Sequence, residues 1–155
     1  MNTEYIYEAE NWKVFDHEFF RIPYLNTWEI IEPEMPIIKF RCITGEDEDY
    51  FFSVTVEAIE LEEKLTLEQQ KENMKKILPH IVNGLNNLQM EELKGNCYGL
   101  RAEFSGIIGN EKVKYVLFSW LIKKTSITIT FTMDYESENI TSLLIDLIVN
   151  FFKIK

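Results

Sequence analysis

The most conspicuous group of chemically capable side chains is the acidic run Glu46, Asp47, Glu48 and Asp49, which follows Gly45. Carboxylate oxygens are the ligands that hard cations such as Ca²⁺ prefer, so the run is a first candidate for a metal site. It lacks the alternating Asp or Asn spacing and the closing Glu of an EF-hand loop. We therefore expect no metal here and interpret the run as a solvated turn whose charge suits a basic protein partner.

A second group, Asp16, His17 and Glu18, has the residue types of an acid-base site. Adjacent residues of a strand point to opposite faces, so His17 faces away from both carboxylates and forms no local dyad with them. His80 is the only other histidine. Two isolated histidines without a Cys or carboxylate pattern make a poor metal site, and we expect both at surface or helix-end positions.

The candidate nucleophiles are equally isolated. Cys97 has no histidine close in sequence, although His17 or His80 could approach it in space. No serine lies in a Gly-x-Ser-x-Gly elbow, and Gly106–Gly109 lacks the helix start and the basic residue of a phosphate-binding loop. The sequence therefore predicts no catalytic residues and no cofactor, and an enzyme is the least favoured of three functional interpretations.

Length and composition indicate what kind of protein this is. The chain has 155 residues, of which 46% are hydrophobic and 14% aromatic, values typical of one globular domain spanning residues 1–155. Its formal net charge is -10. Phosphate neutralisation needs clustered Lys and Arg, so the charge argues against nucleic acid and favours a basic partner.

The compartment follows from the termini and the cysteines. Met1–Glu8 carries acids where a secretory signal has a basic region and an apolar run. The longest apolar runs, such as Tyr115–Ile122, are too short to span a bilayer as a helix. We expect a cytoplasmic protein without membrane insertion, in which Cys42 and Cys97 are buried, reduced thiols rather than a disulfide.

The first half of the chain reads as strands. Asn2–Asn11 is interpreted as a loosely held lead-in with at most one short strand. Apolar spacing and the positions of Pro and Gly then predict four extended segments. The last two are expected to form a hairpin. The segments are Phe15–Ile22, ended by Pro23, Trp28–Ile31, Ile37–Ile43 and Tyr50–Ile59.

A helix follows the hairpin. Thr66 and Gln69 have the spacing of a capping box, which predicts a helix start. Pro79 removes a helical hydrogen bond, so we expect the helix to end near Leu78 or to restart beyond Pro79. Its apolar spacing predicts a buried side made of Leu67, Lys71, Met74, Ile77, Leu78, Ile81 and Leu85.

The second half reads as a meander closed by a helix. In Ser126–Tyr135, apolar residues alternate with Thr and Asp, which is typical of a half-buried strand. A 3-4 apolar spacing from Ile140 to Phe151 then predicts a helix packed on the sheet. Short turns make consecutive strands antiparallel. The class is α+β, with about six or seven antiparallel strands flanked by helices. The other strands are Leu88–Leu93, Tyr98–Ile108 and Lys112–Lys123, with turns at Gly95-Asn96, Gly109-Asn110 and Thr125-Ser126.

The aromatic residues suggest a binding surface. Most of them are expected in the core, because large apolar side chains are usually buried. Phe51 and Tyr115 do not share the parity of the apolar residues of their strands. Their exposure would create a hydrophobic groove or a dimer face, and together with Glu46–Asp49 they are the candidate partner-binding residues.

The order of elements resembles the PsbP-like superfamily, an α-β-α sandwich shared by an extrinsic photosystem II protein, a Ran-binding nuclear import factor and small bacterial proteins. The resemblance extends from about Phe15 to Phe152 and is structural in character. The residues that carry it are Phe19–Pro23 with Trp28, the strand Phe51–Ile59, the helix start Thr66-Leu67-Glu68, the strand Gly99–Phe104, and the strand and helix of Ser126–Phe152.

The resemblance implies a non-enzymatic binding or assembly protein, such as an adaptor, a chaperone or an immunity-type protein. Bacterial relatives include adaptor chaperones of type VI secretion, which hold apolar helices of their cargo and dimerise. The expected partner is thus another protein, either basic or bearing an apolar segment, with homodimerisation as an open alternative. A rival interpretation is a binder of small apolar ligands or lipids in a cleft between sheet and helices.

Overall fold

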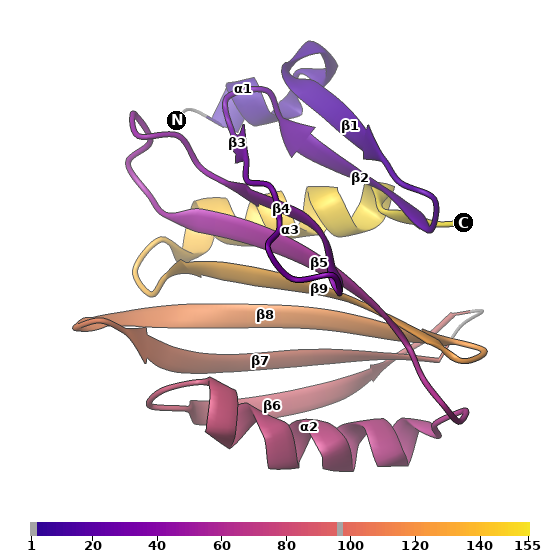
Figure 1. Cartoon of the computed structure of the whole chain (residues 1–155). Coiled ribbons are helices and arrows are strands. Elements are labelled where there is room, and N and C mark those ends of the chain that lie inside the picture. The colour runs from indigo at the N-terminus through magenta and orange to yellow at the C-terminus, as the bar shows by residue number, and fades with distance from the viewer. Residues whose placement is uncertain (1–2, 96–97) are drawn as a thin grey trace.

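The computed structural model describes residues 3–95 and 98–155, which form two antiparallel sheets with helices on both sides (Figure 1). The larger sheet has seven strands in the order β3-β4-β5-β9-β8-β7-β6. This confirms the predicted fold class. The strands are β3 (Glu29–Ile30), β4 (Ile38–Ile43), β5 (Phe52–Glu60), β6 (Asn86–Leu93), β7 (Tyr98–Ile108), β8 (Glu111–Ile122) and β9 (Thr125–Asp134).

The predicted meander is confirmed, because β6, β7, β8 and β9 are neighbours in the sheet and antiparallel. The predicted hairpin of β4 and β5 is also confirmed. Gly109 in the β7–β8 turn has a φ of +62°, as its turn requires. The last turn differs from the prediction. It lies at Lys123 and Lys124, and Lys123 adopts a φ of +55°, so Thr125 and Ser126 already belong to β9.

The amino-terminal strand prediction was wrong in detail. Instead of one strand ending at Pro23, a hairpin of β1 (Trp12–Asp16) and β2 (Phe20–Leu25) is present, with Pro23 opposite Val14. The two-residue strand β10 (Lys153–Ile154) completes a three-stranded sheet by pairing with Phe20 and Arg21. Proline is tolerated inside β2 because β10 ends before it, so its missing N–H is not needed.

From Thr3 onward, the residues before β1 form two short helices in place of the suggested strand. They form α1 (Thr3–Tyr7) and the short 3₁₀ helix η1 (Ala9–Asn11). Ile6 is only 1% exposed and packs in the main core. The indole Nε1 of Trp12 donates a hydrogen bond to the carbonyl of Ile6 at 2.7 Å. A buried anchor therefore holds the segment that the sequence suggested was loosely attached.

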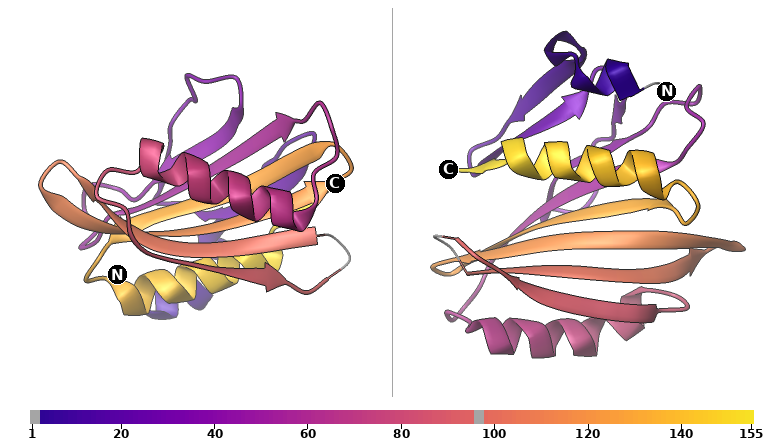
Figure 2. Two further views of the ribbon diagram at one scale, coloured as in Figure 1. Left: turned by 90° about the horizontal axis from the view of Figure 1, so that it is seen from below. Right: turned by 180° about the vertical axis from the view of Figure 1, so that it is seen from behind.

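The main core lies between the larger sheet and α3 (Glu138–Phe151), which crosses one face of that sheet (Figure 2). The alternation in β9 places four apolar side chains on this face, each no more than 2% exposed. They meet Leu144 and Ile148 of α3, both fully buried. The four side chains are those of Ile127, Ile129, Phe131 and Met133.

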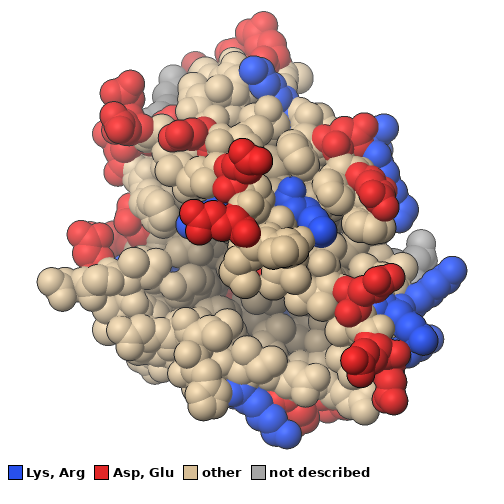
Figure 3. All heavy atoms as spheres, in the orientation of Figure 1, with Lys and Arg blue, Asp and Glu red and all other residues tan. Residues whose placement is uncertain are grey.

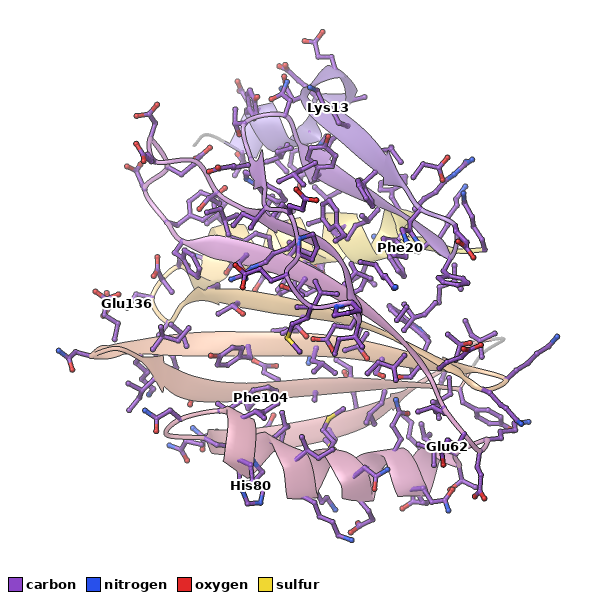
Figure 4. The ribbon with its side chains drawn as sticks, in the orientation of Figure 1. Lys13, Phe20, Glu62, His80, Phe104 and Glu136 are labelled. Atoms are coloured by element: carbon purple, nitrogen blue, oxygen red, sulfur yellow. The ribbon has the colours of Figure 1, made fainter. Side chains whose placement is uncertain are left out.

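The opposite face carries α2 (Leu67–Ile81), so the architecture is an α-β-α sandwich (Figure 2). The capping box is confirmed, because the Gln69 amide donates to Thr66 Oγ1 at 3.2 Å and the Thr66 amide donates to Gln69 Oε1 at 2.9 Å. A second apolar cluster lies under α2 around Phe104 of β7 (Figure 4). Its buried members are Leu78, Val82, Ala102, Phe104 and Leu117.

Two expectations for α2 were wrong. The helix continues through Pro79 to Ile81, where the lost hydrogen bond falls in the last turn. Ile77 and Ile81 are 53% and 69% exposed, whereas Gln70 is buried. The helix is therefore rotated relative to the predicted apolar stripe. Across the described residues, no helix is long and apolar enough to cross a membrane.

Candidate functional site

The acidic run forms an exposed turn between β4 and β5. Glu46 and Asp47 are exposed, and Glu48 is half-buried. The Thr27 hydroxyl donates a hydrogen bond to Glu48 Oε1 at 3.3 Å, which ties the turn to the segment before β3. Among the residues that the structure describes, no three His, Cys, Asp or Glu side chains converge in the manner of a metal site.

A cleft of about 790 Å³ lies beside this turn, at the end of the larger sheet. Asp49 reaches it from the turn and Glu111 from the start of β8. Asp134 lies at the end of β9, and Glu136 lies in the connection to α3. Figure 4 shows Glu136 at this end of the molecule. We call it the acidic cleft; its described lining is Asp49, Tyr50, Glu111, Lys112, Asp134, Tyr135, Glu136, Ser137 and Ile140.

One cation of the chain itself, the Lys112 ammonium, already lies in the acidic cleft. The Lys112 ammonium nitrogen lies 3.8 Å from the centroid of the Tyr135 ring, a distance at which the ring face attracts a cation. The carboxylate of Asp134 accepts a hydrogen bond from the Phe51 amide at 2.7 Å, which fixes one acid in place. Four carboxylates against one ammonium leave the described lining negatively charged.

Phe51 and Tyr115 both lie on the sheet face that carries α2, but they differ in exposure and in their contacts. Tyr115 and Ser53 both pair with Thr132 of β9, and Phe51 lies two residues before Ser53. Phe51 is 39% exposed. Tyr115 is half-buried and stacks on Phe104 with ring centroids 5.0 Å apart, and burial raises the pKa of its phenol. Thus only Phe51 adjoins the acidic cleft.

A second cavity is apolar and occupies about 490 Å³ between the smaller sheet, α1 and α3. Tyr7, Val14 and Phe151 on its walls are each more than 60% exposed. The rival interpretation expected an apolar cleft between a sheet and helices. The cavity has this position, but the sheet that lines it is the smaller one. Sequence reasoning missed it because it joins residues from both ends of the chain. We call it the apolar groove; it is lined by Ile6, Tyr7, Ala9, Trp12, Val14, Pro23, Leu147 and Phe151.

The possible catalytic groups do not converge within the described residues. His17 packs on Phe20 with ring centroids 4.8 Å apart, whereas His80 lies on α2, on the far side of the molecule from Phe20 (Figure 4). Cys42 is buried, and burial raises the pKa of its thiol to about 12, which makes it a poor nucleophile. Cys97, the other candidate thiol, lies outside the described residues.

Comparisons by sequence identify no relative: no protein-family model matches the chain, and no curated protein matches it. Solved structures do match. The solution structure of cyanobacterial PsbP (CyanoP) from Synechocystis sp. PCC 6803 superposes with a TM-score of 0.71 at 13% identity, covering 96% of this chain and 95% of that one.

Two further structures are similar. A Pseudomonas aeruginosa protein of unknown function, described as a putative regulator, has a TM-score of 0.62 at 5% identity and covers 88% of this chain and 92% of its own. LpqN of Mycobacterium tuberculosis, described as involved in cell envelope biogenesis, has a TM-score of 0.59 at 10% identity, with coverages of 93% and 90%. Identities this low establish the fold alone. The agreement over nearly the whole of each chain shows that this chain has the PsbP-like fold.

Proposed function

We propose that this protein is a non-catalytic protein-binding module that holds a basic segment of its partner in the acidic cleft. The observation that carries the proposal is the convergence of Asp49, Glu111, Asp134 and Glu136 on one cavity whose aromatic wall already holds the Lys112 ammonium. A lysine or arginine of a partner would find the carboxylates there, and it would reach the same face of Tyr135 by displacing Lys112.

The strength of such an interaction must come from several contacts together. An ion pair between exposed groups contributes about 0–1 kcal/mol, so no one carboxylate suffices. Opposite charges on two partners mainly accelerate association and make it sensitive to salt. The acidic cleft would therefore bind a segment with two or more basic side chains more tightly than a segment with one. The net charge of -10 adds a long-range attraction for the same class of partner.

The comparisons are consistent with this class of function. The similar structures are described as a PsbP, a putative regulator and a protein involved in cell envelope biogenesis. None of these descriptions names a catalysed reaction. A role as adaptor, chaperone or immunity-type protein, a cytoplasmic location and homodimerisation are finer parts of the same proposal.

The test is affinity purification from the native cell with three forms of the protein. Glu111→Gln/Glu136→Gln removes two charges from the acidic cleft, and neither side chain forms a hydrogen bond or ion pair with another described residue. Glu62→Gln/Glu63→Gln removes the same charge from the exposed segment before α2, on the other side of the molecule from Glu136 (Figure 4). The wild type and the Glu62/Glu63 variant should both recover one stoichiometric partner with a basic segment.

The Glu111/Glu136 variant should lose that partner, and added salt should release it from the other two forms. Cross-linking should place the basic segment of the partner next to Tyr135. Recovery of the same partner by all three forms would show that the acidic cleft is not the binding site. A partner that contacts the apolar groove would favour an apolar segment instead.

The second candidate function rests on the apolar groove, whose wall residues Tyr7, Val14 and Phe151 are exposed without a covering element in the described chain. Its volume of about 490 Å³ lies in the range of small-molecule sites. A fluorescent fatty acid would test this alternative. Saturable binding that is lost in Val14→Asp but kept in Ile77→Asp, a similarly exposed apolar position on α2, would support a lipid-binding function.

A further inference from the structure

A row of four polar side chains crosses the larger sheet on the face that carries α2. Glu57 of β5 is directly opposite Thr128 of β9, and Thr128 is directly opposite Ser119 of β8. Gln70 of α2 lies above Ser119 and donates a hydrogen bond from Nε2 to Ser119 Oγ at 2.6 Å. Ser119 Oγ and Thr128 Oγ1 are hydrogen-bonded at 2.9 Å. Three members are therefore linked in a chain that points toward Glu57.

Glu57, at the end of the row, has no counter-ion among the residues that the structure describes. Its side chain is half-buried and forms no hydrogen bond or ion pair with any other described residue. The cations nearest along the sheet are on β4, where Arg41 is opposite Thr55 and Lys39 lies in an irregular step of the strand. Neither is paired with Glu57. Burial raises the pKa of Glu57, and no neighbouring charge opposes this shift.

The face that carries α2 is uneven. Figure 3 shows a depression above this helix, floored mainly by uncharged residues and bordered by charged ones. The register places hydroxyl groups of β5 and β9 around the row, and none of the four forms a hydrogen bond with another described residue. The hydroxyls are those of Ser53, Thr55, Thr130 and Thr132.

Two groups without partners in this region can only accept hydrogen bonds. The Glu57 carboxylate only accepts hydrogen bonds, and the buried Gln70 Oε1 has no donor among the described residues. Hydroxyl oxygens can accept as well. A ligand that donates several hydrogen bonds and carries a positive charge would suit these acceptors and would offset the half-buried carboxylate. One carboxylate is too few for a dedicated Ca²⁺ or Mg²⁺ site.

We propose that this region of the sheet, with Glu57 as counter-ion and the Thr55, Thr128 and Thr130 hydroxyls as hydrogen-bond acceptors, binds a primary alkylammonium group. An ammonium is compact and has three donors, which suits short hydroxyl side chains around one carboxylate. The group can come from a lysine side chain or from a free polyamine. The site is separate from the acidic cleft, because none of these residues lines that cleft.

The test is a titration of the full chain with n-butylammonium, followed by NMR of the backbone amides and the Glu57 carboxyl carbon. Tetramethylammonium is the matched control, since it has the same charge and no N–H donor. Butylammonium should shift the signals of Thr55 and Thr128 saturably and lower the pKa of Glu57. Glu57→Gln should weaken binding by at least about tenfold, whereas Glu111→Gln in the acidic cleft should leave it unchanged.

Two results would overturn the proposal. Equal shifts with tetramethylammonium and butylammonium would show unspecific attraction of cations. A rise in the Glu57 pKa in Arg41→Ala or Lys39→Ala would show that one of these cations is the counter-ion in solution. If butylammonium binds, the affinities of spermidine and of a peptide with one lysine should be compared. Tighter binding of spermidine would indicate a free polyamine as the source of the ammonium, and tighter binding of the peptide would indicate a lysine side chain.

Discussion

The carboxylate of Asp134 accepts a hydrogen bond from the backbone amide of Phe51 at 2.7 Å, although the two residues are 83 positions apart in sequence. The Asp134 amide in turn donates to the Phe51 carbonyl at 3.3 Å. Asp134→Ala keeps the backbone bond and removes the side-chain acceptor. Because the bond is exposed, we expect the free energy of unfolding to fall by about 1 kcal/mol.

Urea denaturation measures this loss as a lower midpoint with an unchanged slope. Asp134→Asn, which keeps an acceptor oxygen, should lose less than Asp134→Ala. Equal midpoints for Asp134→Ala and the wild type would mean that water replaces the carboxylate at the Phe51 amide without cost.

Removal of the charge at Glu57 should stabilise the protein. Burial raises the pKa of Glu57 in the folded state above its unfolded value. The neutral form therefore favours folding at low pH, and this contribution is lost as the pH rises through the folded pKa. Glu57→Gln stays neutral throughout, so its melting temperature should exceed that of the wild type at pH 7 and equal it near pH 3.

Thermal unfolding across this pH range checks the Glu57 prediction. Lys39 and Arg41 on β4 are the cations that could stabilise the Glu57 carboxylate and so lower its pKa. On the other side of Glu57, β9 presents only hydroxyl groups. A lower melting temperature of Glu57→Gln at pH 7 would mean that one of these cations stabilises the carboxylate.

The register of β9 predicts unequal effects of neighbouring substitutions. Ile129 is fully buried between the sheet and α3, whereas Thr130 is half-buried on the other face. Ile129→Ala should reduce the free energy of unfolding by about 2–5 kcal/mol, and Ile129→Asp should prevent folding. Thr130→Val, the matched change on the other face, should fold normally. A native circular-dichroism spectrum and melting temperature for Ile129→Asp would contradict the register.

Cys42 should be unreactive in the native protein. Burial raises the pKa of its thiol to about 12, so the thiolate is scarce at pH 8, and the side chain is only 1% exposed. In a Cys97→Ser background, Ellman's reagent should modify Cys42 only after denaturant is added. Rapid modification without denaturant would show that β4 opens frequently.

The sequence predicts most of the fold because alternation and capping are local signals. The pattern in β9, the capping box at Thr66 and the glycine turn at Gly109 each act within a few residues. Pairings between distant segments carry no such signal. The junction of β5 with β9 and the addition of β10 to β2 could not be read from periodicity.

The candidate sites were less predictable for the same reason. Asp49 and Phe51 were recognised from the sequence. The acids that complete the acidic cleft come from distant segments of the chain: Glu111, Asp134 and Glu136. Gln70 was missed because a polar residue at a helical position normally reads as exposed. Its burial becomes visible only when Ser119 is placed beneath it.

The position of β9 between β8 and β5 also has a kinetic consequence. The hairpins from β6 to β9 close over short turns, whereas β5 reaches β9 only after α2 and three strands have been spanned. Local contacts form faster than distant ones, so β9 should present an open, aggregation-prone edge until β5 arrives. Pulse-labelling hydrogen exchange during refolding should show amides of β7 and β8 protected before those of β4 and β5, and simultaneous protection would contradict this order.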